Sequence, residues 1–235
     1  MKNYSTTKSQ TATIDEGLRS YFIKVYNYMA GGLLLTAIAA YLVANTSLIN
    51  AFFTPTGMSG LGWIALLAPI FMIFGFGWVL TRGTLAQVQG VFWGFSALMG
   101  ISISPILIAY TGASVTRVFL ITSATFGAMS LYGYTTKKDL SGMGSFMMMG
   151  LWGIIIASIV NIFMKSSGMY YALSYLTVAV FVGLTAWDTQ KIRLMYSAAD
   201  SDDTASRKAI SGALSLYMDF INMFLALLRI MGDRR

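Results

Sequence analysis

Apolar residues occur in long blocks along this chain, separated by short polar connections. Each block holds about 20 residues or more with few charges, which is the length that an α-helix needs to cross the hydrocarbon core of a bilayer. This pattern predicts an all-α, polytopic membrane protein with seven transmembrane helices. The blocks are Val25–Ala44, Leu61–Leu80, Val88–Ala109, Val115–Tyr134, Met143–Met164, Met169–Trp187 extended to about Tyr196, and Ala205–Met231.

The polar N-terminus and the basic connections set the expected domains and orientation. Residues 1–24 are charged and lack an apolar core, so we expect a cytosolic tail without a signal peptide, followed by one transmembrane domain over residues 25–235. A cytosolic N-terminus places most of the 16 Lys and Arg residues on the cytosolic side, as the positive-inside rule requires. Arg234 and Arg235 leave open a last segment that re-enters without a full crossing.

Composition excludes several classes of function. The chain has no Cys and no His, which excludes disulfides, Cys-ligated metal and Ser-His hydrolysis, and we expect no enzyme. The net charge is +7, but the basic residues are scattered and form no block that could bind nucleic acid. We therefore interpret the charge as positive-inside bias and attraction to anionic lipid of the bilayer.

Two carboxylates lie at the edge of or inside apolar blocks, at Asp188 and Asp219. An acidic side chain within a membrane is costly and indicates a functional site. The midpoint between the two residues falls beside Asp203, so a helical hairpin folded there would bring both acids to the same depth. The alternative for Asp188 is an interfacial position near Lys191 and Arg193, in contact with water.

Polar residues in the last block fall on one helical stripe. Steps of three or four residues from Lys208 lead through Ser215, Asp219 and Asn222 to Arg229, while the other positions are apolar. A polar stripe within a membrane must face protein or water, so this helix is expected at the centre of the bundle. The stripe is also compatible with a purely structural seam of hydrogen bonds.

Small residues recur at every fourth position in the middle blocks. Gly90 with Gly94, the series Ser96, Gly100 and Ser104, and the pair Ser123 and Gly127 each lie on one helical face. Small residues let helix backbones approach closely in a membrane, so these positions predict helix contacts.

Three segments together resemble the Bax inhibitor-1 family of transmembrane Bax-inhibitor-motif proteins. They are Gly183–Ile192, Ala213–Arg229 and Gly100–Pro105, with Asp188 and Asp219 at the centre of the first two. The resemblance implies a seven-helix fold with a central last helix. It also implies a protein of the bacterial inner membrane that acts as a pH-sensitive calcium leak channel, controlled by a hydrogen-bonded pair of aspartates.

The resemblance assigns roles to single residues. Asp188 and Asp219 match the two aspartates of the pH-sensing pair, Arg229 matches the basic residue beyond the second of them, and Arg82 is a weaker match for an arginine that latches onto the pair. Some relatives also carry an acidic residue in the second span, which this chain lacks.

Calcium is expected as a permeant ion and not as a cofactor. Calcium prefers six to eight oxygen ligands, whereas the expected interior offers Asp188 and Asp219 with candidates such as Asn222 and Thr185. Binding of calcium or another cation to the two aspartates is therefore expected to be weak and transient.

Two other classes of function are compatible with the sequence. A proton-coupled secondary transporter would use the same acids as a proton relay, although such proteins normally show internal repeats that are not visible here. A non-transporting regulator would bind a membrane protease or another membrane complex, with residues 1–24 as the contact.

Overall fold

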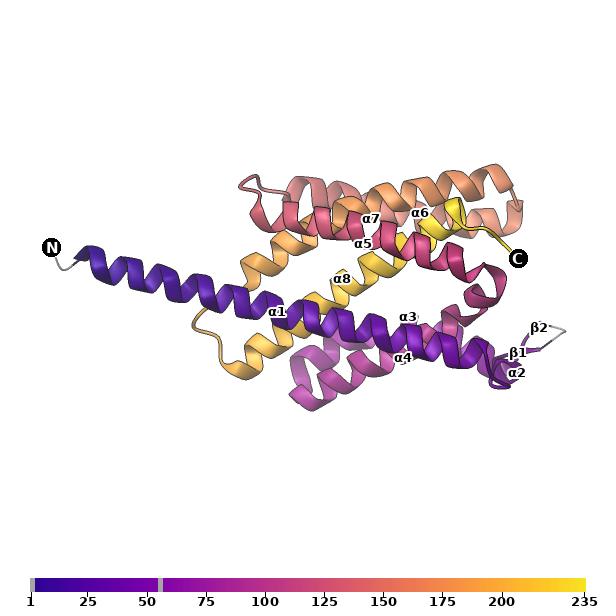
Figure 1. Ribbon diagram of the computed structural model, residues 1–235, viewed down its shortest axis with the longest axis horizontal. Helices are drawn as coiled ribbons and strands as arrows, with labels where there is room; N and C mark the ends of the chain where they lie inside the picture. The colour runs from indigo at the N-terminus through magenta and orange to yellow at the C-terminus, as the bar shows by residue number, and fades with distance from the viewer. Residues whose placement is uncertain (1–2, 55–56) are drawn as a thin grey trace.

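The computed structural model describes residues 3–54 and 57–235, with side chains from residue 16 onward. Within these residues it confirms an all-α membrane fold with seven helices that are long and apolar enough to cross a bilayer, the first of them over Glu16–Ala44. A two-residue antiparallel ribbon joins the first two spans. The elements, shown in Figure 1, are α1 (Asn3–Ala44), α2 (Ile49–Phe52), β1 (Phe53–Thr54), β2 (Gly57–Met58), α3 (Gly60–Arg82), α4 (Leu85–Ala109), α5 (Gly112–Thr135), α6 (Ser141–Met164), α7 (Ser167–Met195) and α8 (Asp202–Met231).

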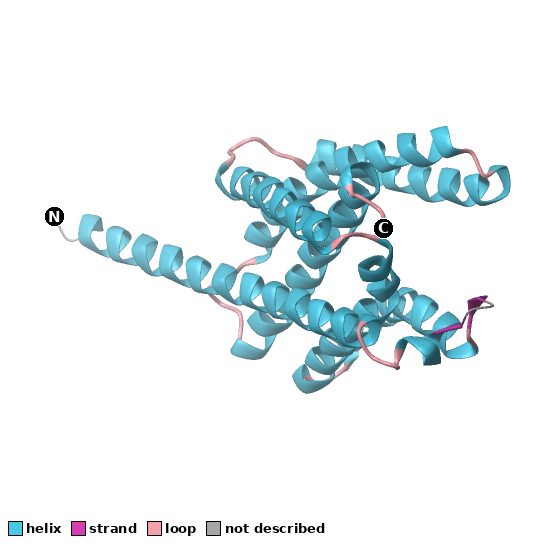
Figure 2. Cartoon of the chain, turned by 45° about the vertical axis from the view of Figure 1, so that its right-hand side comes forward, coloured by secondary structure: helices cyan, strands magenta, loops and turns pink. Residues whose placement is uncertain are grey.

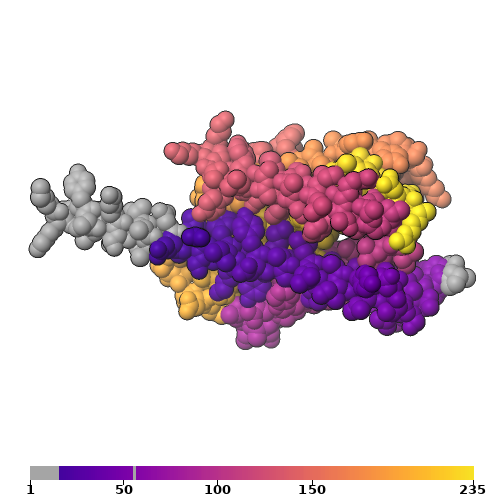
Figure 3. All heavy atoms as spheres, viewed as in Figure 1, coloured from indigo at the N-terminus to yellow at the C-terminus, as the bar shows by residue number. Residues whose placement is uncertain are grey.

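Helix α8 occupies the centre of the bundle, as its polar stripe predicts. It packs against α7, α1, α5 and α4, whereas α3 lies outside against α4 and α6 lies outside against α7. Figure 2 shows that long helices make up the bundle and that the short ribbon lies at its edge. In the space-filling view of Figure 3, α8 is largely covered and its two ends reach the visible face. The outer position of α6 agrees with the exposure of its side chains, because only Gly144 of that helix is buried.

Helix α1 does not end at the expected border between tail and membrane domain. It continues without interruption across residue 24, and Tyr21 and Phe22 are only 5% exposed. Their aromatic rings contact Tyr196 and Tyr134, respectively, so the body of the protein begins before residue 24. The charges of the N-terminal segment hide this continuation, because the buried residues lie on one face of the helix only.

Helix starts follow ordinary capping chemistry. Ser59, Thr111, Ser166 and Ser201 each accept a hydrogen bond from a backbone N–H in the first turn of the helix that follows. Thr84 forms a capping box with Gln87 at the start of α4. These polar residues end the short connections and satisfy backbone N–H groups at the helix starts.

The C-terminus lies beside the connection between α4 and α5. The backbone N–H of Arg235 donates to the Ala109 carbonyl at 3.0 Å, and that of Thr111 donates to the Asp233 carbonyl at 3.0 Å. Since α8 begins at the face where α5 and α7 end and finishes at the face where α4 ends, it traverses the whole bundle. The structure therefore differs from a re-entrant last segment.

The orientation of the bundle remains a prediction from the basic residues. We expect Lys137→Cys, in the exposed connection after α5, to react with a membrane-impermeant maleimide only from the cytosolic side. Ser47→Cys, in the exposed connection after α1, should react only from the opposite side. Labelling in intact cells and in inverted vesicles tests both, on a chain without native Cys. Labelling of Lys137→Cys from outside the cell would reverse the orientation.

Candidate functional site

The two membrane aspartates lie together where α7 contacts α8. The Asp188 and Asp219 carboxyl groups are within hydrogen-bonding reach of each other. Asp219 is 3% exposed, and its Oδ2 atom accepts no hydrogen bond from an N–H or hydroxyl group among the described residues. Two carboxyl groups can form a hydrogen bond only if one of them carries a proton. A hydrogen bond between these two carboxyl groups therefore requires one proton on the pair.

The register between α7 and α8 places the two acids at the same level. Gly212 packs against the Ile192 side chain, which would lie 2.9 Å from a Cβ added at Gly212. Nearer the connection, the Lys208 ammonium donates to the Met195 carbonyl at 3.0 Å and forms an ion pair with Asp200 at 2.6 Å. These contacts fix α8 against the end of α7.

The connection itself differs from the hairpin turn expected at Asp203. The chain leaves α7 at Met195, and α8 begins at Asp202, so Asp203 lies in the first turn of α8. Lys208 lies level with Met195, so the first turn of α8 extends beyond the end of α7 and the connection continues outward to reach it. The nearly equal spacing of Asp188 and Asp219 from Asp203 predicts which residues of α7 and α8 lie side by side. It does not predict where the chain turns, because the turn precedes Asp202.

A chain of hydroxyl groups lies beside Asp188 and joins three helices. Thr189 of α7 donates to the Thr185 carbonyl at 2.7 Å and lies 3.0 Å from the Ser130 hydroxyl of α5. Ser130 is also hydrogen-bonded to the Tyr26 hydroxyl of α1. The sequence does not predict this row of hydroxyl groups, because single hydroxyl residues are common in membrane helices and carry no distinctive spacing.

A second polar contact lies two residues before Asp219. The Tyr217 hydroxyl is 2.7 Å from the Thr36 hydroxyl of α1, and Thr36 also makes a 2.8 Å hydrogen bond to the Ser96 carbonyl of α4. Both side chains are buried. The centre of α8 is thus joined through Thr36 to α1 and α4, while Asp219 faces Asp188 of α7.

The structure does not bring Arg82, the expected latch, to the pair, and it places Arg229 away from it as well. Arg82 is exposed at the end of α3, and no hydrogen bond or ion pair joins it to either acid in the described part of the chain. Arg229 is exposed near the far end of α8, with its guanidinium 5.8 Å from the Tyr170 ring centroid.

The other polar groups near the pair have their own partners. The Asn222 amide donates to the Met218 carbonyl within α8 at 2.8 Å, and Thr185 donates to the Phe181 carbonyl at 2.7 Å. Arg193 donates to the Thr136 carbonyl at 3.2 Å. Lys191 is the basic residue whose charge acts on Asp188, and its ammonium lies over the Trp187 ring.

The donor set around the pair is small. Among the described residues, no group of three or more His, Cys, Asp or Glu side chains lies close enough together to hold a metal ion. Two carboxylates, with carbonyl and hydroxyl oxygens of α7 and α8, fall short of the six to eight oxygens of a tight calcium site. Any calcium held here would be held weakly.

Comparisons with known proteins agree over nearly the whole chain. The sequence model of the family described as "Inhibitor of apoptosis-promoting Bax1" matches residues 18–235. "Inner membrane protein YbhL" of Escherichia coli K12 is 45% identical over 222 residues, which cover 93% of this chain and 94% of that protein. "Uncharacterized protein RP147" of Rickettsia prowazekii is 48% identical over 234 residues, covering 98% and 96% of the two chains.

Proposed function

Because the chain belongs to the Bax inhibitor-1 family, we propose that it is a calcium-permeable leak channel whose flux is controlled by the proton shared between Asp188 and Asp219. The similar protein YbhL is named an inner membrane protein, which supports a place in the bacterial inner membrane. The chain would then conduct calcium or a similar cation down its gradient, without catalysing a reaction.

The observation that carries this proposal is the buried contact between the two carboxyl groups. With one proton between them, the pair holds one negative charge and a hydrogen bond across α7 and α8. Loss of that proton leaves two negative charges facing each other in a bilayer, where repulsion is weakly screened. The repulsion favours an arrangement in which α7 and α8 separate, so proton occupancy can select between closed and open bundles.

The same two aspartates are proposed as transient ligands of the permeant ion. Asn222 lies three residues after Asp219 on the stripe of α8, and its side-chain carbonyl adds an oxygen ligand at a nearby level. A site with few oxygen ligands binds calcium weakly, and weak binding permits the ion to leave. The proposal therefore concerns passage and not storage of calcium.

The two arginines are proposed to act at the ends of the bundle. Arg82 can reach the deprotonated pair only if the end of α3 moves relative to α8. A link between these elements exists, because Arg207 of α8 donates to the Leu80 carbonyl of α3 at 3.1 Å. Arg229, held over Tyr170 of α7, is proposed to keep the opposite end of α8 fixed while the pair rearranges.

The function is tested with purified protein in liposomes loaded with a calcium-sensitive dye. We expect calcium entry on addition of external calcium, at a rate that varies with pH and needs no proton gradient. If collapsing the proton gradient stops calcium entry, the protein is a proton-coupled transporter. Entry no faster than in empty liposomes at every pH would contradict the channel and leave the regulator as the remaining interpretation.

A further inference from the structure

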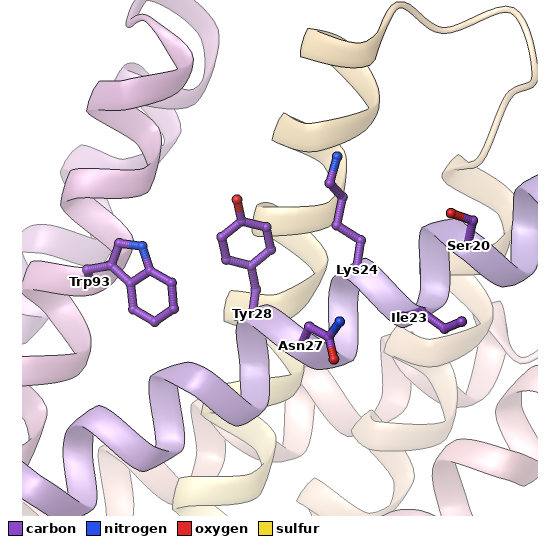
Figure 4. Close-up of a pocket in the computed structure, with 6 residues that line it drawn as sticks. All are labelled: Ser20, Ile23, Lys24, Asn27, Tyr28 and Trp93. Atoms are coloured by element: carbon purple, nitrogen blue, oxygen red, sulfur yellow. The ribbon is translucent and has the colours of Figure 1, made fainter.

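A shallow groove of about 380 Å³ lies between α1 and α4, near the start of the membrane-spanning part of α1 (Figure 4). Its walls carry polar and aromatic side chains, which is unusual on a surface that faces lipid. In Figure 4 the Lys24 side chain extends from α1 toward α8, and Trp93 stands across the groove on α4. The lining residues are Ser20, Ile23, Lys24, Asn27, Tyr28 and Trp93.

The Lys24 ammonium is held in place by α8. It donates to the Ser206 hydroxyl oxygen at 2.7 Å, and Ser206 in turn donates its own proton to the Asp202 carbonyl at 2.6 Å. An ammonium group has three N–H donors, so two remain for a ligand. The charge is therefore positioned at the groove and not simply extended into water.

The aromatic residues of the groove also present donors. The Tyr28 hydroxyl accepts a hydrogen bond from the Gln89 amide at 2.7 Å, which leaves its own O–H free to donate. Trp93 packs against Tyr28 with ring centroids 5.8 Å apart, and its indole N–H can only donate. No carboxylate lines the groove among the described residues, and Asp203 on the adjacent turn of α8 is paired with Arg207 at 2.6 Å. The chemistry of the groove suits an anion.

The depth of Lys24 suits the headgroup region of a bilayer. The following 20 residues, Val25–Ala44, are uncharged and would span about 30 Å as a helix, which is the thickness of the hydrocarbon core. If these 20 residues cross the hydrocarbon core, Lys24 lies at the level of the lipid phosphates, where Tyr and Trp are also favoured. Ile23 is 50% exposed at the edge of the groove.

We propose that this groove binds the headgroup of an anionic glycerophospholipid, with its phosphate on Lys24 and its glycerol region against Tyr28 and Trp93. Basic pockets between transmembrane helices are a recurrent form of lipid recognition. Lys24 also joins α1 to α8, so a lipid bound here would contact the helix that carries Asp219. The proposal is independent of the ion-channel function, because it concerns only lipid binding.

Native mass spectrometry of the full-length protein tests this site. Phosphatidylglycerol is compared with phosphatidylethanolamine of the same acyl chains, and we expect one tightly retained phosphatidylglycerol with about fivefold higher affinity. Lys24→Gln should remove this preference, whereas Lys24→Arg should retain it. Lys137→Gln, which removes the same charge from an exposed connection, is the matched control and should behave as the wild type.

A fluorescence measurement keeps the test independent of folding in the Lys24 variants. Brominated phosphatidylglycerol should quench wild-type Trp93, measured as the difference from Trp93→Phe, more strongly than brominated phosphatidylcholine. Equal quenching by the two lipids, or an unchanged lipid preference in Lys24→Gln, would overturn the proposal. Displacement of the lipid by inorganic phosphate alone would also overturn it, because the site would then bind a free anion.

Discussion

Replacing Asp219 with Asn is expected to flatten the pH dependence of calcium flux between about pH 6 and pH 8, the range in which a protonated membrane carboxyl could act. The amide keeps nearly the shape of the carboxyl group but cannot lose a proton to become charged. Because Asp219 is 3% exposed and faces Asp188, the substitution removes the proton-dependent repulsion at the centre of the bundle. Flux into dye-loaded liposomes at a series of pH values measures the effect.

The size of the expected effect follows from the electrostatics of the pair. Two unit charges about 4 Å apart interact with about 4 kcal/mol at the effective dielectric constant of about 20 that describes partly buried sites. Each 1.4 kcal/mol changes an equilibrium about tenfold, so even half of this energy biases the arrangement of α7 and α8 more than tenfold. Losing that bias should be visible as a flat pH profile and not as a small displacement.

Two further variants show whether the effect belongs to the pair. Asp188→Asn should flatten the profile as Asp219→Asn does, because either amide removes one of the two charges whose repulsion depends on the shared proton. Asp139→Asn is the control: hydrogen bonds from the Ser141 side chain and backbone hold the pKa of Asp139 below its usual value. A lowered pKa keeps Asp139 ionised throughout the range tested, so this variant should retain the wild-type profile. If both Asp188→Asn and Asp219→Asn keep the wild-type pH profile of calcium flux, the pair is a structural seam and not a pH sensor.

The acid pair illustrates what sequence alone can predict in this protein. A carboxylate within an apolar block is conspicuous because its cost in a membrane is high, and the polar stripe of α8 indicates which side faces protein. Those two signals predict that Asp219 lies inside the bundle and that Asp188 belongs to a functional site. The latch at Arg82 came from resemblance alone, and the structure gives Arg82 no contact with the pair.

Close helix contacts were harder to predict, because glycine spacing does not say which neighbour faces the glycine. Gly100 meets the Thr36 backbone of α1, as its small-residue series suggests. Gly90 and Gly127 have nothing within 4 Å of an added Cβ, so their spacing marks no helix contact. The closest approach beside the acid pair is made instead by Gly133, which belongs to none of the predicted series.

Gly133→Ala is therefore expected to destabilise the protein strongly, whereas Gly127→Ala should not. A Cβ at Gly133 would overlap the backbone carbonyl of Ala186 on α7, and backbone cannot move aside as a flexible side chain could. Overpacking of this kind costs about 1–3 kcal/mol, which corresponds to a loss of about 2–12 °C in the temperature of thermal unfolding. Thermal unfolding in detergent measures the difference.

Gly127 lies on the same helix and provides the matched control. An added methyl group there meets open space, and Ala favours a helix over Gly, so Gly127→Ala should be as stable as the wild type or slightly more stable. Because Ala186 precedes Asp188 by two residues, a displaced α7 in Gly133→Ala should also alter calcium flux. Equal unfolding temperatures for the two variants would mean that α5 and α7 are not held in backbone contact, and that Gly133 does not set the position of Asp188.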